Sequence, residues 1–221
     1  MGHKYAIPSV LTHALSRLKR YYTSDFKVWN DPAERARYVD ASPLDAMCVI
    51  QLALLTDTPS LLPTAYLICC DVLDYTYTSP DEVAGQLVIR DFPDQNLLCV
   101  MSGHTQLLQA AAARVLPLVS AIATGTCPCP SRCALHGISL LRSRHLDRSV
   151  FKKLNHDGAL GPLDAWFLEH PTGRLCSACD ANVRHVDVLC RARVWSRLPD
   201  AFGLTLTQDE WPSKKANAGQ A

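Results

Sequence analysis

The sequence predicts an all-α protein, built as an irregular multi-helix domain, and three observations support this prediction. Glycine accounts for only 10 of the 221 residues, and stretches in which β-branched and polar residues alternate are nearly absent. Apolar residues instead recur three and four positions apart, which places them on one side of a helix. With 48% hydrophobic and 19% charged residues, the chain contains enough apolar material for a sizeable core.

The N-terminal part of the chain contains two strong helix patterns. Residues 8–22 (PSVLTHALSRLKRYY) begin with a proline, which suits the first position of a helix, and they carry an apolar face. This face consists of Val10, Leu11, Ala14, Leu15 and Leu18. A second helix is expected to open at SPLD, where Ser42 and Asp45 have the spacing of a capping box. It continues through AMCVIQLALL, which is apolar nearly all round and therefore predicts a central helix.

The rest of the chain is also expected to be mainly helical. Further helices are predicted at residues 61–73, 97–103, 105–124, 134–146, 162–170 and about 176–197. Gly103 is expected to separate two of them, and the prolines of CPCPSRC to end the helix before it. Apolar helical surroundings predict that four cysteines lie in the core, namely Cys48, Cys69, Cys70 and Cys99. Residues 206–221 are polar and are predicted to be a disordered tail.

Ten cysteines are many for a chain of this length, so the compartment matters for their chemistry. The N-terminal stretch MGHKYAIPSVLTHAL lacks the layout of a signal peptide, and LLPTAYLICC is too short to span a bilayer. The sequence therefore predicts an intracellular protein, cytoplasmic or nuclear, that neither spans nor binds a membrane. In such compartments thiols stay reduced, which favours metal binding or burial over a disulfide framework.

Two cysteine groups have the spacing of a metal site. CPCPSRC contains Cys127, Cys129 and Cys133, and RLCSAC contains Cys176 and Cys179. A structural zinc site needs four nitrogen or sulfur ligands, usually two close pairs brought together by folding. The predicted ligands are Cys127, Cys133, Cys176 and Cys179, with Cys129 as the substitute for Cys127. Reduced buried thiols and a disulfide remain open as alternatives for these residues.

Motifs and charge argue against an enzyme and against a nucleic-acid binder. The sequence contains no G-x-S-x-G, H-E-x-x-H, P-loop or G-x-G-x-x-G pattern, so we predict that the protein is not an enzyme. The formal net charge is only +1, and the basic clusters at 17–20, 142–148 and 191–197 are interleaved with apolar residues. Such clusters are typical of the solvated side of a helix, which makes a nucleic-acid partner the less favoured reading.

Several stretches together resemble one protein family. GHKYAIPSVLTHALSRLKRYY resembles the final helical segment of a BTB (POZ) domain, and the remainder resembles the C-terminal region of fungal BTB domain-containing proteins. The landmarks are VWNDPAERARYV, LTDTPSLLPTAYLICC, RLCSAC and VWSRLPDAFGL. The chain begins at Met1 just before GHKY, so it resembles the helical remainder of such a protein, as a truncated gene model would give.

The resemblance implies a domain organisation and a function. It divides the chain into the last helix of a truncated BTB domain (1–22), a helical C-terminal domain (23–205) and the tail (206–221). The apolar face of the first helix is then expected to be poorly covered. The family implies a protein–protein interaction module, a scaffold or a ubiquitin-ligase adaptor when full length, with homodimerisation only if the missing BTB part is present. A nucleic-acid-associated transcriptional regulator is the alternative. The C-x5-C spacing of Cys127 and Cys133 is also associated with this family.

Overall fold

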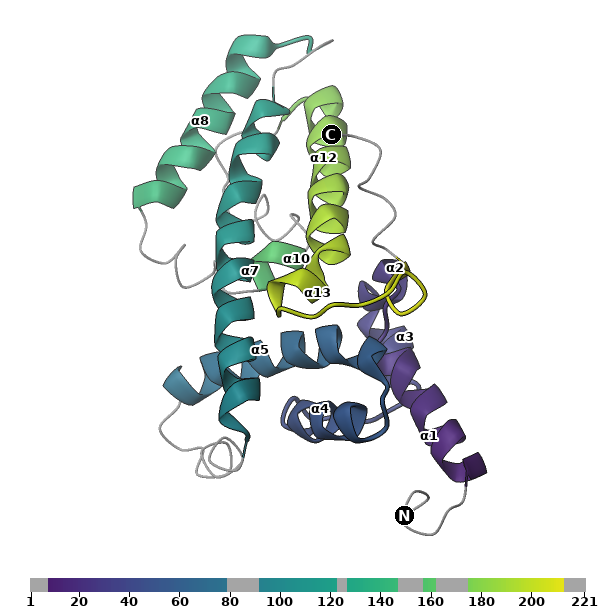
Figure 1. The fold of residues 1–221 in the computed structure, drawn as a ribbon. Coiled ribbons are helices and arrows are strands. Elements are labelled where there is room, and N and C mark those ends of the chain that lie inside the picture. The colour runs from purple at the N-terminus through teal and green to yellow at the C-terminus, as the bar shows by residue number, and fades with distance from the viewer. Residues whose placement is uncertain (1–7, 79–91, 123–126, 147–156, 162–174, 213–221) are drawn as a thin grey trace. The chain divides into compact units, whose positions relative to one another are not determined.

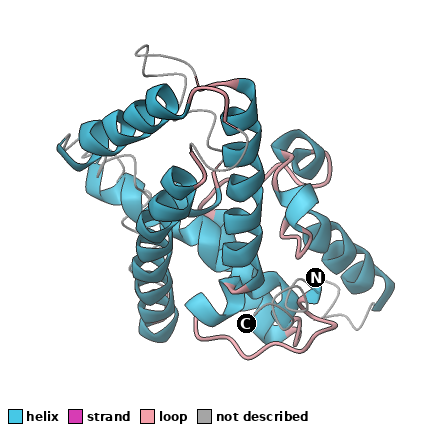
Figure 2. Cartoon of the chain, turned by 90° about the horizontal axis from the view of Figure 1, so that it is seen from above, coloured by secondary structure: helices cyan, strands magenta, loops and turns pink. Residues whose placement is uncertain are grey.

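A computed structural model describes residues 8–78, 92–122, 127–146, 157–161 and 175–212 of the chain. Helices and connecting loops make up all of these segments, and no strand occurs among them (Figure 2). The prediction of an all-α protein is therefore confirmed. None of the helices in the described part of the chain has both the length and the hydrophobicity needed to cross a lipid bilayer.

The chain divides into two compact units. Unit 1 comprises Met1–His104 together with Ser196–Ala221, and unit 2 comprises Thr105–Trp195. Unit 1 is thus discontinuous in sequence, whereas unit 2 is one continuous stretch. The boundaries predicted at residues 22 and 205 stay a prediction.

Unit 1 contains the N-terminal helices, labelled in Figure 1. They are α1 (Pro8–Tyr21), α2 (Phe26–Trp29), α3 (Pro32–Ala36), α4 (Asp45–Leu55), the 3-10 turn η1 (Pro59–Leu61) and α5 (Leu62–Thr78). The beginning of α7 (Asp94–Ser120) and the short α13 (Leu198–Ala201) complete this unit. Unit 2 contains the rest of α7, then α8 (Pro130–Leu146), α10 (Asp157–Leu160) and α12 (Ser177–Ser196) up to Trp195.

Local sequence explains where the helices of unit 1 start and what they bury. The backbone N–H of Ser42 donates to Asp45 Oδ2 over 2.7 Å, which is one of the two bonds of the predicted capping box. Ser42 is not the N-cap, however, because the Ser42 hydroxyl accepts from the Leu44 N–H and α4 begins at Asp45 with Leu44 as its N-cap. Helix α4 then packs along α5, which is buried from Leu62 to Cys70. No residue of α1 is fully buried, but Leu11, Leu15 and Leu18 are half-buried and Val10 is half exposed. The apolar face is therefore partly covered, and the expected poor coverage holds only for its start at Val10.

The core of unit 1 joins segments that are far apart in sequence. The rings of Tyr66 on α5 and Phe202 after α13 are stacked, with their centroids 5.4 Å apart. The Tyr66 hydroxyl donates to Asn96 Oδ1 over 3.0 Å, and both side chains are buried. Trp211 is fully buried, and Glu210 accepts a hydrogen bond from the Thr207 N–H. The prediction of a disordered tail was therefore wrong for residues 206–212; the remainder of the tail lies outside the described residues.

Three other expectations were wrong for physical reasons. Helix α7 runs through Gly103 without a break, because that glycine provides room for a neighbouring ring and does not end the helix. Helix α8 begins at Pro130 and not at residue 134, since proline is favoured in the first turn. Cys48 is exposed, although Cys69 and Cys70 are buried as predicted; Cys99 is half-buried. The predicted helix at 162–170 lies outside the described residues.

Unit 2 contains a buried ionic network. The carboxylate of Asp187 on α12 accepts hydrogen bonds from the guanidinium of Arg114 on α7, and the side chains of both residues are almost fully buried. Arg191 Nε also donates to this carboxylate over 3.0 Å, and Arg114 Nη2 donates to the carbonyl of Gly161 over 2.8 Å. Burial lowers the pKa of Arg114, and the bond to Asp187 partly offsets this effect. The network ties α7 to α12 and to the end of α10.

Candidate metal centre

The cysteines of unit 2 are positioned by the beginnings of two helices. The segment CPCPSRC leads into α8, which starts at Pro130, so Cys133 lies in the first turn of that helix. The Cys133 N–H donates to the Cys129 carbonyl over 3.1 Å, which fixes the turn. Cys176 immediately precedes α12, and its carbonyl accepts a hydrogen bond of 2.9 Å from the Asp180 N–H. Prolines and helix starts therefore orient these thiols locally.

Four thiols converge at this place. The sulfur atoms of Cys127, Cys129, Cys133 and Cys176, here called the quartet, all lie within 4.8 Å of one another. Cys127 Sγ is 3.7 Å from Cys176 Sγ, and Cys129 Sγ is 3.6 Å from Cys133 Sγ. With zinc–sulfur bonds of about 2.3 Å, the edges of a tetrahedral four-thiolate site measure about 3.8 Å. The quartet could therefore hold a metal ion with little movement of its sulfur atoms.

Backbone amides stabilise negative charge on two of these sulfurs. The Cys179 N–H donates to the Cys176 sulfur and lowers the pKa of Cys176 to about 6. The Cys176 N–H acts in the same way on Cys133, whose pKa is also lowered. A bound cation needs thiolate ligands, and N–H donors on sulfur favour the thiolate over the thiol. These two N–H donors therefore favour the thiolate form of Cys133 and Cys176, which is the form that would bind a cation.

The other two sulfurs of the quartet favour the protonated form. Burial raises the pKa of Cys127 to about 12, and a hydrogen bond with the Cys133 thiol raises the pKa of Cys129 to about 11. The quartet thus combines thiolate-favouring and thiol-favouring sulfurs that are joined by hydrogen bonds between sulfur atoms. A cation at the centre would displace these protons, because metal binding and thiol deprotonation are coupled.

Cys179 is a fifth thiol beside the quartet. Its side chain interacts with the thiols of Cys127 and Cys176, and it is only 2% exposed. Three of the four predicted ligands belong to the quartet, and the structure completes it with Cys129 where the sequence had favoured Cys179. The predicted ligand set stays a prediction. The C-x-x-C and C-x5-C spacings do not show which cysteines would bind the metal and which would only lie beside the site.

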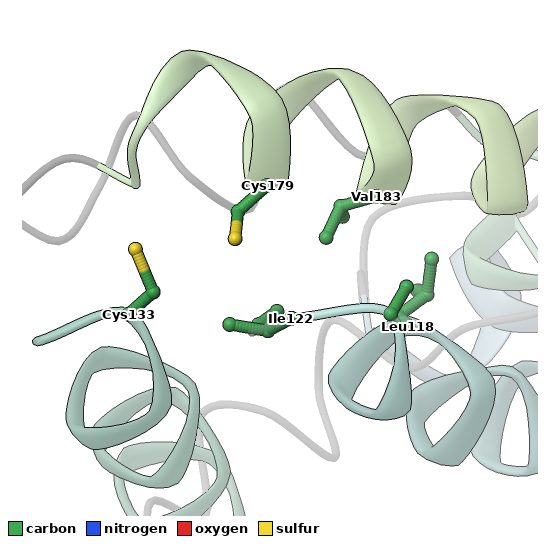
Figure 3. Packing of buried hydrophobic residues seen from close by; sticks show 6 residues of the cluster. Leu118, Ile122, Cys133, Cys179 and Val183 are labelled. Carbon is green, nitrogen blue, oxygen red and sulfur yellow. The ribbon is translucent and has the colours of Figure 1, made fainter. Parts of the chain in front are cut away.

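An apolar cluster packs against the cysteines, and Figure 3 shows Cys133 and Cys179 within it. Cys133 and Cys179 are buried together with Leu118 and Ile122 at the end of α7 and Val183 on α12. Cys127, Cys129 and Cys176 pack against this cluster and are half-buried. This environment limits the access of water to the thiols from one side, while the half-buried thiols remain accessible from the other.

The fold and the site together define an all-α protein with a four-cysteine centre that could hold a metal ion. Comparison of the chain with protein-family models, with curated proteins and with solved structures finds no significant match.

Proposed function

We propose that this chain is a non-enzymatic helical module for binding other proteins and that the quartet is its structural zinc site. The observation that carries the zinc assignment is the sulfur geometry: four thiols lie within 4.8 Å of one another, and two pairs of sulfurs are 3.6 and 3.7 Å apart. Four-coordinate tetrahedral sites with four cysteines are typical of structural zinc. Soft thiolate ligands disfavour magnesium and calcium, which prefer oxygen.

A structural zinc ion would act here as a clamp. It would connect the loop at 127–129 and the first turn of α8 to the start of α12, which lies more than forty residues further along the chain. Four protein ligands leave no open coordination position for a substrate or an activated water. The quartet therefore fits a stabilising role better than a catalytic one.

Exposed apolar side chains support a protein-binding role. Within unit 1, Leu54 and Leu55 at the end of α4 are 55% and 78% exposed, and on α7 Leu98 is 66% exposed. Contiguous exposed apolar patches mark surfaces that bind proteins, and the adjacent Leu54 and Leu55 are the candidate for such a patch. The resemblance to the C-terminal region of fungal BTB domain-containing proteins leads to the same proposal, with a scaffold or ubiquitin-ligase adaptor as the role of the full-length form.

The structure gives less support to the alternative of a nucleic-acid-associated regulator. Arg17 donates to the Tyr38 carbonyl, Arg20 lies 4.8 Å from the Tyr38 ring centroid, and Arg191 pairs with Asp187. Described arginines from two of the three basic clusters thus interact within the protein. A gel shift with random DNA at increasing salt tests the alternative, since binding through phosphate contacts weakens steeply with salt.

Metal analysis tests the zinc site directly. The full chain, purified under reducing conditions without a chelator, should contain about one zinc ion per chain by atomic emission. Exchanging Cys133 and Cys176 for serine should abolish binding, whereas Cys48→Ser is the matched control because that thiol is exposed and belongs to unit 1. A reduced, folded protein without bound metal would overturn the assignment.

The interaction role needs a separate experiment. Proteins that cross-link to the wild-type chain should no longer cross-link to a variant that combines Leu54→Glu with Leu55→Glu. The reason is that burying a charge in an apolar contact is unfavourable. Gln51→Glu, also exposed on α4, adds a charge without removing apolar surface and serves as the control. An unchanged set of cross-linked proteins in the leucine variant would exclude this surface.

A further inference from the structure

Two pairs of thiols within the quartet have no residue in common and are hydrogen-bonded through their sulfur atoms. Cys127 and Cys176 form one pair, with sulfurs 3.7 Å apart, and Cys129 and Cys133 form the other, at 3.6 Å. The pairs share no residue, so the four thiols can form two disulfides with none left over. Since the sulfurs of a disulfide lie about 2.05 Å apart, each pair would have to close by roughly 1.6 Å.

We propose that the centre is a redox-convertible clamp, in which a peroxide converts the zinc-bound quartet into the disulfides Cys127–Cys176 and Cys129–Cys133 and releases the zinc. This inference rests on the proposed zinc site. The oxidised centre still joins the loop before α8 to the start of α12, because Cys127 and Cys176 belong to these two segments. The connection therefore persists when the metal leaves.

The chemistry of each pair is balanced. One thiolate attacks the peroxide, the O–O bond breaks, and a sulfenic acid and hydroxide form. The second thiolate of the pair attacks the sulfenic sulfur, which forms the S–S bond and expels a second hydroxide. Two protons convert the hydroxides into water. The two thiolates are oxidised by two electrons and the peroxide is reduced, so the whole quartet consumes two peroxide molecules and releases one zinc ion.

Exposure favours this pairing over a disulfide between Cys176 and Cys179. Cys127, Cys129 and Cys176 are half-buried, so a small oxidant can reach one or both members of each pair. Cys179 is 2% exposed and packs in the apolar cluster with Val183 and Ile122 (Figure 3). A sulfenic acid on Cys127 or Cys176 meets its partner of the quartet at 3.7 Å, so the two sulfurs have to close by roughly 1.6 Å.

The experiment uses the full chain after its zinc content has been measured. Graded hydrogen peroxide is added in the presence of a chromogenic zinc chelator, and the disulfides are then mapped by mass spectrometry without reduction. We expect one zinc ion released per two peroxide molecules consumed, with peptides linked through Cys127–Cys176 and through Cys129–Cys133. Zinc that stays bound in excess peroxide, a Cys176–Cys179 linkage, or sulfinic acids without cross-links would overturn the inference.

Two variants test whether zinc release and the disulfide linkages depend on the quartet and not on other cysteines. Cys179→Ser should keep both zinc release and the Cys127–Cys176 linkage, and Cys190→Ser, on the same helix but outside the quartet, should behave like the wild type. Circular dichroism confirms that each variant is folded. If the reduced protein binds no zinc, the proposed site and this inference fail together. If zinc binds but the wrong linkages form, only this inference fails.

Discussion

Gly103 on α7 and the ring of Phe202 lie so close together that no side chain fits between them. A Cβ atom on Gly103 would lie 2.1 Å from two carbon atoms of that ring. The same ring stacks on Tyr66, so it has little freedom to move away. The glycine is therefore required by packing in the core of unit 1.

Gly103→Ala should lower the free energy of unfolding by about 1–3 kcal/mol, because overpacking forces the ring or the backbone to shift. This loss should appear even though alanine is favoured over glycine by about 1 kcal/mol inside a helix. Urea denaturation followed by circular dichroism measures it. Gly137→Ala on α8 is the matched control, since the nearest atom that its Cβ would meet is the terminal Cδ1 of Ile122 at 3.1 Å, and the other two Ile122 atoms lie at ordinary contact distances of 3.5 and 3.6 Å. Equal stability of the two variants would contradict this account of Gly103.

The buried network around Asp187 should contribute more to stability than an exposed ion pair. Arg114→Met leaves the Asp187 carboxylate with Arg191 as its remaining ionic partner, so we expect a loss of about 3 kcal/mol in the free energy of unfolding. Arg184→Met breaks an exposed pair with Asp180 on the same helix and should cost less than about 1 kcal/mol. Chemical denaturation of both variants tests this difference, and similar losses would contradict it.

The raised pKa of Tyr66 predicts a loss of stability at alkaline pH. Burial raises the pKa of Tyr66 from its ordinary value near 10 to about 12 in the folded protein. A group with a raised folded pKa contributes stability that is fully present below pH 10 and is lost as the pH rises toward 12. Phenolate absorbance and thermal melts between pH 9 and 12 measure both effects. Tyr66→Phe should flatten part of this dependence; an unchanged slope would show that Tyr66 does not cause it.

The fourth ligand can be identified by a pair of serine variants. Cys129→Ser removes a sulfur of the quartet, so zinc should be lost in competition with a chromogenic chelator. Cys179→Ser removes only the neighbouring thiol and should keep about one zinc ion per chain. Retention of zinc by Cys129→Ser and its loss in Cys179→Ser would favour the set predicted from the sequence.

Helix patterns near the N-terminus were predictable because the signals are local. The bond from the Ser42 N–H to Asp45 and the helix that begins at Pro8 depend only on nearby residues, and both appear in the structure. The role of Gly103 could not be predicted in this way. A glycine that ends a helix and one that accommodates a distant ring look alike in sequence, and Phe202 lies almost a hundred residues away.

The candidate site, too, was only partly predictable from the sequence. Cysteine spacing predicted that CPCPSRC and RLCSAC would meet, and four of their thiols do converge. The identity of the fourth member depended on the first turn of α8, which begins at Pro130 and brings Cys129 next to Cys133. Similarly, the polar composition of residues 206–221 concealed Trp211, because one buried aromatic residue changes the composition very little.

The discontinuity of unit 1 has a consequence for biosynthesis. Residues 196–221 complete this unit, and they supply the buried side chains of Leu198, Phe202 and Trp211. On the ribosome, Met1–His104 emerges before unit 2 but has to wait for residues 196–212, which emerge after it, whereas Thr105–Trp195 emerges as one uninterrupted piece. Unit 2 can therefore complete its core while residues 196–212 are still being synthesised. Unit 1 can complete its core only after these residues have emerged, so its apolar surface stays exposed to chaperones for longer.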